Sequence, residues 1–192
     1  ATLARLRFHM SDTAPIIRGV LIQVAEARLL LPNATIAEVL SYADPDPIAD
    51  APDWLLGRIR WRGWQLPLVS FSRFTGIAEE KGGLGSKVIV LKALGGDAKH
   101  PFFALLTLGF PRLVTVTEAA LGSEGDDASV PEGVLARVRL NEDDALLPDL
   151  AALEAEATRA TADLERAERL AQDKVIAAQE LDRARAAAQA AA

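Results

Sequence analysis

The segment from Trp54 to Phe74, WLLGRIRWRGWQLPLVSFSRF, constrains the fold of this chain more than any other part of the sequence. Leu56 to Trp61 and Gln65 to Ser70 have the length and the apolar content of β-strands. They flank Arg62-Gly63-Trp64, in which glycine supplies the positive φ that a tight hairpin turn demands. The segment therefore predicts a β-hairpin, and a short turn or a single helical coil over residues 72–76 after it.

Further short apolar runs, separated by turn residues, occur on both sides of this hairpin. Each is long enough for one strand, and turn residues such as Ala25-Glu26-Ala27 and Gly95-Gly96-Asp97 lie between neighbouring runs. This spacing predicts an all-β arrangement of small barrels over residues 15–148. The predicted strands are GVLIQV, RLLL, KVIVLKAL, PFFALLTL, RLVTVT and VLARVRL, the last with Arg137 and Arg139 on a solvated face.

Between these runs the sequence predicts irregular or helical connections. Pro32 cannot extend a central ladder, and the three- and four-residue spacing of Ile36, Val39 and Leu40 predicts a short helical turn. Residues 41–53 contain three prolines and predict an extended surface linker. Glycine and acidic residues predict loops over residues 79–86 and 122–133.

The composition changes after Pro148, from which point glycine and proline are absent and alanine is abundant. Asp149 is a suitable N-cap, so we expect one long helix from Leu150 onward. Apolar residues step by three and four along a narrow seam, but Lys174 and Arg185 interrupt it and alanine buries little area. We expect a helix that packs partly on the barrels and then projects, with self-association as an open alternative.

The composition also excludes several classes of function. The 192 residues include no cysteine and two histidines, His9 and His100, so we expect no metal site, no cofactor and no thiol chemistry. The absence of cysteine fits a reducing cytoplasm. No apolar run reaches the roughly 18 residues that a membrane helix needs. Residues 1–9 precede Met10 and are interpreted as an alternative start or an added segment.

Motifs for catalysis or phosphate binding are weak. Gly82 to Lys87 resembles a phosphate loop, but Ser86 separates the last glycine from the lysine and a strand follows. The acid pairs Glu79-Glu80, Asp126-Asp127 and Asp143-Asp144 lie in predicted loops or at strand ends, where solvated charges are the rule. We therefore expect no catalytic residues, and a hydrolase built on His100 is the most distant alternative.

The strip of Arg58, Arg60 and Arg62, with Trp61 and Trp64 beside it, supports a different alternative. Arginines that hold phosphates and aromatic rings that stack on bases are the parts of a single-stranded nucleic-acid-binding barrel. However, the formal charge of the chain is -6, and the arginines have potential partners in the acidic linker and Glu38. A structural or protein-contact role is therefore favoured.

Two ordered motifs resemble the CheW-like coupling domains of bacterial chemosensory arrays. LLLPNATIAEVL resembles one family segment, and PDWLLGRIRWRGWQLPLVSF resembles the central Gly-x-x-x-x-Arg-Gly-x-x-x-Pro core. VLARVRLNEDDALLPDLAAL resembles the last strands and the start of the C-terminal helix. The resemblance covers residues 16–153, and Trp-Arg-Gly followed by Pro-Leu-Val-Ser-Phe is more similar to the accessory ChpC-type adaptors of pilus-linked twitching systems.

This resemblance implies two SH3-like five-stranded barrels forming one domain over residues 15–153, with residues 1–14 as a poorly ordered extension and residues 154–192 as a helical tail. It implies a non-enzymatic adaptor that couples the cytoplasmic tip of a chemoreceptor to the regulatory domain of a sensor histidine kinase. We further expect Glu38 and Arg62 to form an ion pair that shapes the receptor groove. Carried over position by position, that groove involves Ile36, Glu38, Val39, Gly57, Arg62 and Gly63.

Overall fold

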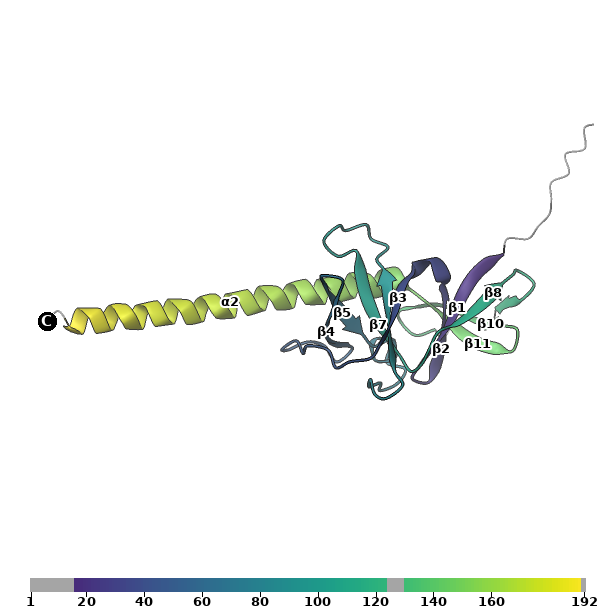
Figure 1. Cartoon of the computed structure of the whole chain (residues 1–192), viewed down its shortest axis with the longest axis horizontal. Helices are drawn as coiled ribbons and strands as arrows, with labels where there is room; N and C mark the ends of the chain where they lie inside the picture. The colour runs from purple at the N-terminus through teal and green to yellow at the C-terminus, as the bar shows by residue number, and fades with distance from the viewer. Residues whose placement is uncertain (1–15, 124–129, 191–192) are drawn as a thin grey trace, which may run out of the picture.

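The computed structural model describes residues 16–123 and 130–190, so the predicted extension over residues 1–14 lies outside the described residues. These described residues form eleven strands and two α-helices, and the second helix extends far from the β-structure (Figure 1). The elements are β1 Ile17–Val24, β2 Ala27–Pro32, η1 Asn33–Thr35, β3 Ile36–Ser41, β4 Leu55–Trp61, β5 Trp64–Val69, α1 Phe71–Phe74, β6 Lys87–Lys92, β7 Phe102–Thr107, β8 Arg112–Val116, β9 Leu121–Ser123, β10 Val134–Leu140, β11 Asp143–Pro148 and α2 Leu150–Ala190.

The strands form two sheets. One has the order β8-β1-β2-β11-β10-β9 and the other the order β3-β6-β7-β5-β4. The chain therefore leaves the first sheet after β2, builds the whole second sheet and returns. The predicted pair of intertwined small barrels is confirmed. The first sheet has six strands instead of five, because Leu121–Ser123 pairs with β10 where the sequence predicts a loop.

Each sheet encloses its own apolar core, and a third core lies between the sheets. In β6, for example, Val88 and Val90 belong to the core of the second sheet, whereas Ile89 and Leu91 belong to the central core. Side chains alternate across a strand, so a strand that is apolar on both faces serves two cores at once. All five strands of the second sheet contribute to its core, which is the property of a barrel.

The predicted helical turn at residues 34–40 is wrong. Only Asn33–Thr35 forms a 3-10 turn, and Ile36–Ser41 is strand β3, which pairs antiparallel with β6. A register irregularity lies between Ile36 and Glu38, so Ile36 and Val39 contact the central core on one face of the strand. One extra residue at a bulge changes the two-residue period of a strand into a spacing that imitates a helix.

The hairpin of β4 and β5 has the predicted position and a two-residue turn. Arg62 has φ 47° and Gly63 has φ 84°. Two successive positive φ angles are the mark of a type I′ turn, whose twist matches that of the flanking strands. Trp64, which the sequence predicts in the turn, already pairs with Trp61 as the first residue of β5.

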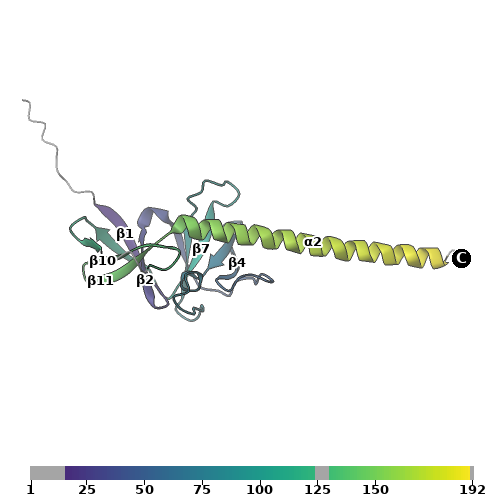
Figure 2. The ribbon, with the colours of Figure 1, turned by 180° about the vertical axis from the view of Figure 1, so that it is seen from behind.

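Helix α2 begins as predicted, because the Asp149 carboxylate accepts a hydrogen bond from the Ala152 amide at 3.0 Å. Leu153 and Ala157 are fully buried in the central core, and Leu164 packs against its edge. From Arg166 to Ala186 every residue is exposed, and the helix projects from the barrels (Figure 2). Among the described residues, no helix combines the length and the apolar character that crossing a bilayer requires.

Candidate functional site

The predicted ion pair of Glu38 and Arg62 is present, and it lies where the second barrel closes. The Glu38 carboxylate on β3 lies 2.9 Å from Arg62 Nη2 and accepts a hydrogen bond from the indole Nε1 of Trp61 at 2.8 Å. The Arg62 guanidinium lies 5.1 Å from the centre of the Trp61 ring, within cation–π range. Because β3 and β4 are the two edges of their sheet, these contacts join edges that no ladder hydrogen bonds connect.

The ion pair is accessible to a partner, and it lies on the buried side chain of Trp61. The Arg62 side chain is 70% exposed and that of Glu38 is 35% exposed, so both can contact a partner. Trp61 is 9% exposed and packs edge-on against Phe102, with ring centres 4.9 Å apart. A charged pair on a buried aromatic support is pre-organised for recognition, because less side-chain freedom is lost on binding.

Gly57 is buried, and the reason for glycine at this position is structural. The residue has φ 145°, and a Cβ atom there would lie 2.4 Å from the carbonyl oxygen of Asp46. The linker runs antiparallel beside β4 at this point, since Asp46 and Arg58 exchange two backbone hydrogen bonds of 2.8 Å. Gly57 therefore allows residues 45–46 to lie directly on β4.

The structure separates the six predicted site residues into two groups. Glu38, Arg62 and Gly63 meet at an accessible corner of the second barrel. Ile36 and Val39 are half-buried against the central core, and Gly57 lies beneath the linker. The shared location of all six is β3, β4 and the turn after β4. Trp61 joins the corner, although the sequence marks it only as a core or stacking residue.

A cleft of about 300 Å³ opens beside this corner, between β3, the linker and β4. Its lining carries both signs of charge, from Asp44 and Asp46 and from Arg58 and Arg60, together with apolar residues. Arg60 Nε lies 4.0 Å from Asp46. The residues that line the cleft are Leu40, Ser41, Ala43, Asp44, Asp46, Arg58, Ile59, Arg60 and Val88.

The arginine strip is neutralised by acidic neighbours. Arg62 pairs with Glu38, Arg60 lies near Asp46, and Arg58 lies 3.7 Å from Glu165 of α2. The Trp61 ring is buried, so its face is not available for a base. A strip whose arginines are matched by carboxylates lacks the unbalanced positive potential on which nucleic-acid affinity depends.

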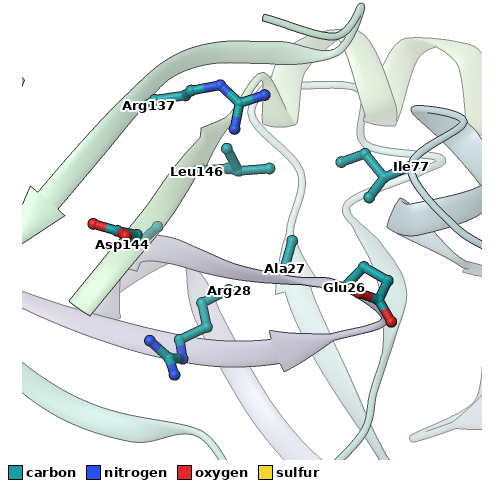
Figure 3. A pocket seen from close by; sticks show the side chains of 8 residues that line it. Glu26, Ala27, Arg28, Ile77, Arg137, Asp144 and Leu146 are labelled. Carbon is teal, nitrogen blue, oxygen red and sulfur yellow. The ribbon is translucent and has the colours of Figure 1, made fainter. Parts of the chain in front are cut away.

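A second pocket, of about 160 Å³, lies between the β1–β2 turn, the β10–β11 hairpin and the segment after α1 (Figure 3). Ala27, Leu146 and Ile77 give it an apolar wall, and Arg137 and Glu26 lie at separate places on its rim. Mixed charge around a small open pocket does not assemble a nucleophile, a base and an oxyanion-stabilising group.

Glu80 does not have the solvated position that the sequence predicts. The residue is 2% exposed, and its carboxylate accepts from the Ala25 amide at 2.8 Å and from the Ser70 hydroxyl at 2.7 Å. Burial raises the pKa of Glu80, although these hydrogen bonds and nearby Arg73 oppose the effect. Both Glu80 carboxylate oxygens accept hydrogen bonds that hold the β1–β2 turn against the start of α1, which is a structural role.

Of the other acid pairs, Asp126-Asp127 lies outside the described residues.

His100 gives no support to a hydrolase. Its Nδ1 lies 2.8 Å from Asp97, and the hydrogen bond lowers the pKa of that carboxyl. Both side chains are exposed, at 39% for His100 and 51% for Asp97, whereas a catalytic dyad would need burial. Within residues 16–123 and 130–190, no group of histidines and carboxylates could hold a metal ion.

Comparisons with known proteins agree with this fold. A family model described as the CheW-like domain matches residues 18–157, which include both barrels and the first turns of α2. No curated protein matches the chain. Among solved structures, the scaffolding protein TtCheW from Thermoanaerobacter tengcongensis is similar, with a TM-score of 0.60 and 16% identity over 75% of this chain and 91% of that chain. At this identity the structural likeness concerns the fold.

Proposed function

Because this chain belongs to the CheW-like domain family, we propose that it is a non-enzymatic adaptor that couples chemoreceptors to a sensor histidine kinase. The observation that carries the proposal is the accessible corner formed by Glu38, Trp61 and Arg62. The corner presents one anion, one cation and an aromatic support, with no reactive group nearby. Such a surface recognises a protein partner by complementary charge.

We propose that the receptor tip binds over β3, β4 and the turn after β4, in contact with the corner. Ile36 and Val39 then shape the surface from below, and Gly57 keeps the linker in place. Gly63 fixes the backbone of Arg62 through the turn. The kinase regulatory domain binds a different surface, so that both partners are held at once. Weak contacts of this kind gain strength when many copies assemble.

Charge reversal tests the role of the pair. Glu38→Arg and Arg62→Glu should each weaken binding of a chemoreceptor cytoplasmic tip, measured by calorimetry. The double variant should recover part of the affinity, since the ion pair is restored. Recovery should be incomplete, since an arginine in place of Glu38 cannot accept a hydrogen bond from the Trp61 indole. The matched control is the reversal of Arg139 and Asp144, an exposed ion pair on β10 and β11 of the other sheet whose atoms are 2.7 Å apart. Failure of the rescue in a folded double variant would refute the pairing.

Finer assignments follow from the sequence. The Trp61-Arg62-Gly63 turn and the Pro67 strand are the basis on which we propose a ChpC-like adaptor, cytoplasmic and serving pilus-driven twitching. Residues 15–153 are then the coupling domain and residues 154–192 the helical tail. Deletion of this chain should abolish twitching and leave pili assembled. Normal twitching of the deletion strain would remove the ChpC-like assignment.

We also propose self-association through the projecting part of α2. The support is four large apolar side chains that the tail exposes to solvent, namely Leu170, Val175, Ile176 and Leu181. Sedimentation equilibrium should give a concentration-dependent mass for the full chain and a monomer mass for a chain that ends at Arg169. Identical monomer masses for the two chains would contradict this.

A further inference from the structure

Arg58 on β4 lies under helix α2 and faces two of its glutamates. Arg58 Nη2 is 3.7 Å from Glu165 Oε1, and Arg58 Nη1 is 4.0 Å from Glu168 Oε2. The Arg58 side chain is 18% exposed, whereas the two glutamates are 44% and 48% exposed. The glutamates are three residues apart, so they occupy neighbouring positions on one face of the helix. Arg58 therefore connects the edge of the second barrel to the helix.

The contact occurs where the helix leaves the barrels. Among the residues of α2 up to Ala186, Thr161 is the last buried one, Leu164 is half-buried, and Arg166 to Ala186 are exposed. The 25 residues from Arg166 to Ala190 extend for roughly 37 Å at 1.5 Å per residue. A small rotation at the point of departure therefore moves the end of the helix by a large distance.

The contact is also weak for a buried cation. Within the described part of the chain, Arg58 Nε and Nη2 are buried and have no hydrogen-bond partner. Both glutamates are too far away for a hydrogen bond, so the attraction is a charge interaction alone. A buried guanidinium with unsatisfied N–H groups carries a desolvation cost, which offsets much of the attraction. By contrast, two hydrogen bonds of 2.8 Å to Asp46 hold the Arg58 backbone firmly.

We propose that Arg58 is a clamp that sets the direction of α2 and that opens when its two glutamates are screened or displaced. When the clamp is closed, residues 158–168 lie on the barrel and the helix projects as a rigid arm. When it is open, the turn that carries Glu165 and Glu168 separates from β4, whereas Thr161 and Leu164 stay packed, and the arm samples many directions. The central core keeps the first turns in place through Leu153 and Ala157, which are fully buried.

The same arginine connects the arm to the candidate site. Arg58 lines the cleft beside the Glu38 and Arg62 corner as well as the space under the helix. An acidic side chain of a protein bound over the cleft therefore competes with Glu165 and Glu168 for the unsatisfied N–H groups. This part of the inference rests on the proposed function, whereas the clamp itself is internal to the chain.

Distances between two spin labels test the clamp in the full chain. The sequence contains no cysteine, so Leu135→Cys on β10 and Gln172→Cys on α2 give one label pair at exposed positions. We expect one narrow distance distribution in low salt. Arg58→Gln should at least double the width of this distribution. Addition of 1 M KCl to the labelled chain that keeps Arg58 should do the same. The matched control Arg60→Gln, which removes a contact to Asp46 only, should leave the width unchanged.

A second variant separates opening of the clamp from unfolding. Glu165→Gln combined with Glu168→Gln removes the partners from the helix side and should widen the distribution equally, with unchanged tryptophan emission from the barrel. Equal widths for wild type, Arg58→Gln and the double variant would overturn the clamp. A receptor tip that binds without widening the distribution would overturn the coupling to the cleft. Absence of tip binding would refute the proposed function and leave the clamp standing.

Discussion

Substitution of Gly57 by alanine tests the account of how the linker is held on β4. The added Cβ would lie 2.4 Å from the Asp46 carbonyl oxygen and 3.0 Å from the Pro45 Cβ. Both neighbours belong to the linker, and the nearer one is a backbone atom. The clash is therefore relieved only by movement of the chain.

The expected cost has two parts. A non-glycine residue at φ 145° costs about 1 to 3 kcal/mol in backbone strain. Movement of the linker breaks the two Asp46–Arg58 backbone hydrogen bonds, at about 0.5 to 1.5 kcal/mol each. The free energy of unfolding should therefore fall by roughly 2 to 6 kcal/mol.

Urea unfolding followed by tryptophan emission is the appropriate assay, because Trp54, Trp61 and Trp64 all flank or belong to this hairpin. Gly63→Ala is the matched control. Its φ is also positive, at 84°, but a Cβ there would meet nothing within 4 Å, so we expect a loss of only about 1 to 2 kcal/mol. If Gly57→Ala is no more destabilising than Gly63→Ala, close approach of the linker does not explain the glycine.

Other perturbations give distinct expectations. Because burial raises the pKa of Glu80, its proton is bound more tightly in the folded chain than in the unfolded one, where the ordinary value is 4.5. The stability that this group contributes is complete below pH 4.5 and is lost as the pH rises through the raised pKa. The plot of urea midpoint against pH should therefore be flatter above pH 4.5 for Glu80→Gln than for the wild type. Parallel plots for the two proteins would contradict this. At concentrations where the chain is monomeric, Leu153→Ala should cost about 2 to 5 kcal/mol in urea unfolding and Leu181→Ala less than about 0.5 kcal/mol, because only the first side chain is buried within the chain; equal costs would mean that α2 does not pack as described. Trp61→Phe removes the indole donor to Glu38 and should cost about 1 to 3 kcal/mol in the same assay, whereas a neutral result would mean that this bond does not help to close the barrel.

The parts of the fold that the sequence predicts correctly have strong local signals. The Arg62-Gly63 turn fixes its hairpin because only a few residues tolerate positive φ, and the turn lies where predicted. The start of α2 also has a local signal, because Asp149 caps the helix and the alanine-rich segment favours it. Strand β3 imitates a helical turn in the sequence because its bulge places Ile36 and Val39 at a three-residue spacing. Strand β9 has three residues and gives no pattern of its own.

The candidate site also contains contacts that the sequence predicts and contacts that it does not. The motifs bring Glu38 and Arg62 close enough to predict their ion pair, which is present at 2.9 Å. The contact of Arg58 with Glu165 joins residues more than a hundred positions apart and depends on the path of α2 across β4. Burial of Glu80 depends on how its loop folds back on the β1–β2 turn. Neither contact leaves a local signal in the sequence.

The most direct test of the central claim is whether this chain joins the two proposed partners. An immobilised chemoreceptor cytoplasmic tip is mixed with the regulatory domain of a sensor histidine kinase, with and without the full chain, and the retained kinase domain is measured. We predict retention only when the chain is present, and several-fold less with Arg62→Glu. Equal retention with and without the chain, or no dependence on Arg62 in a folded variant, would contradict the account.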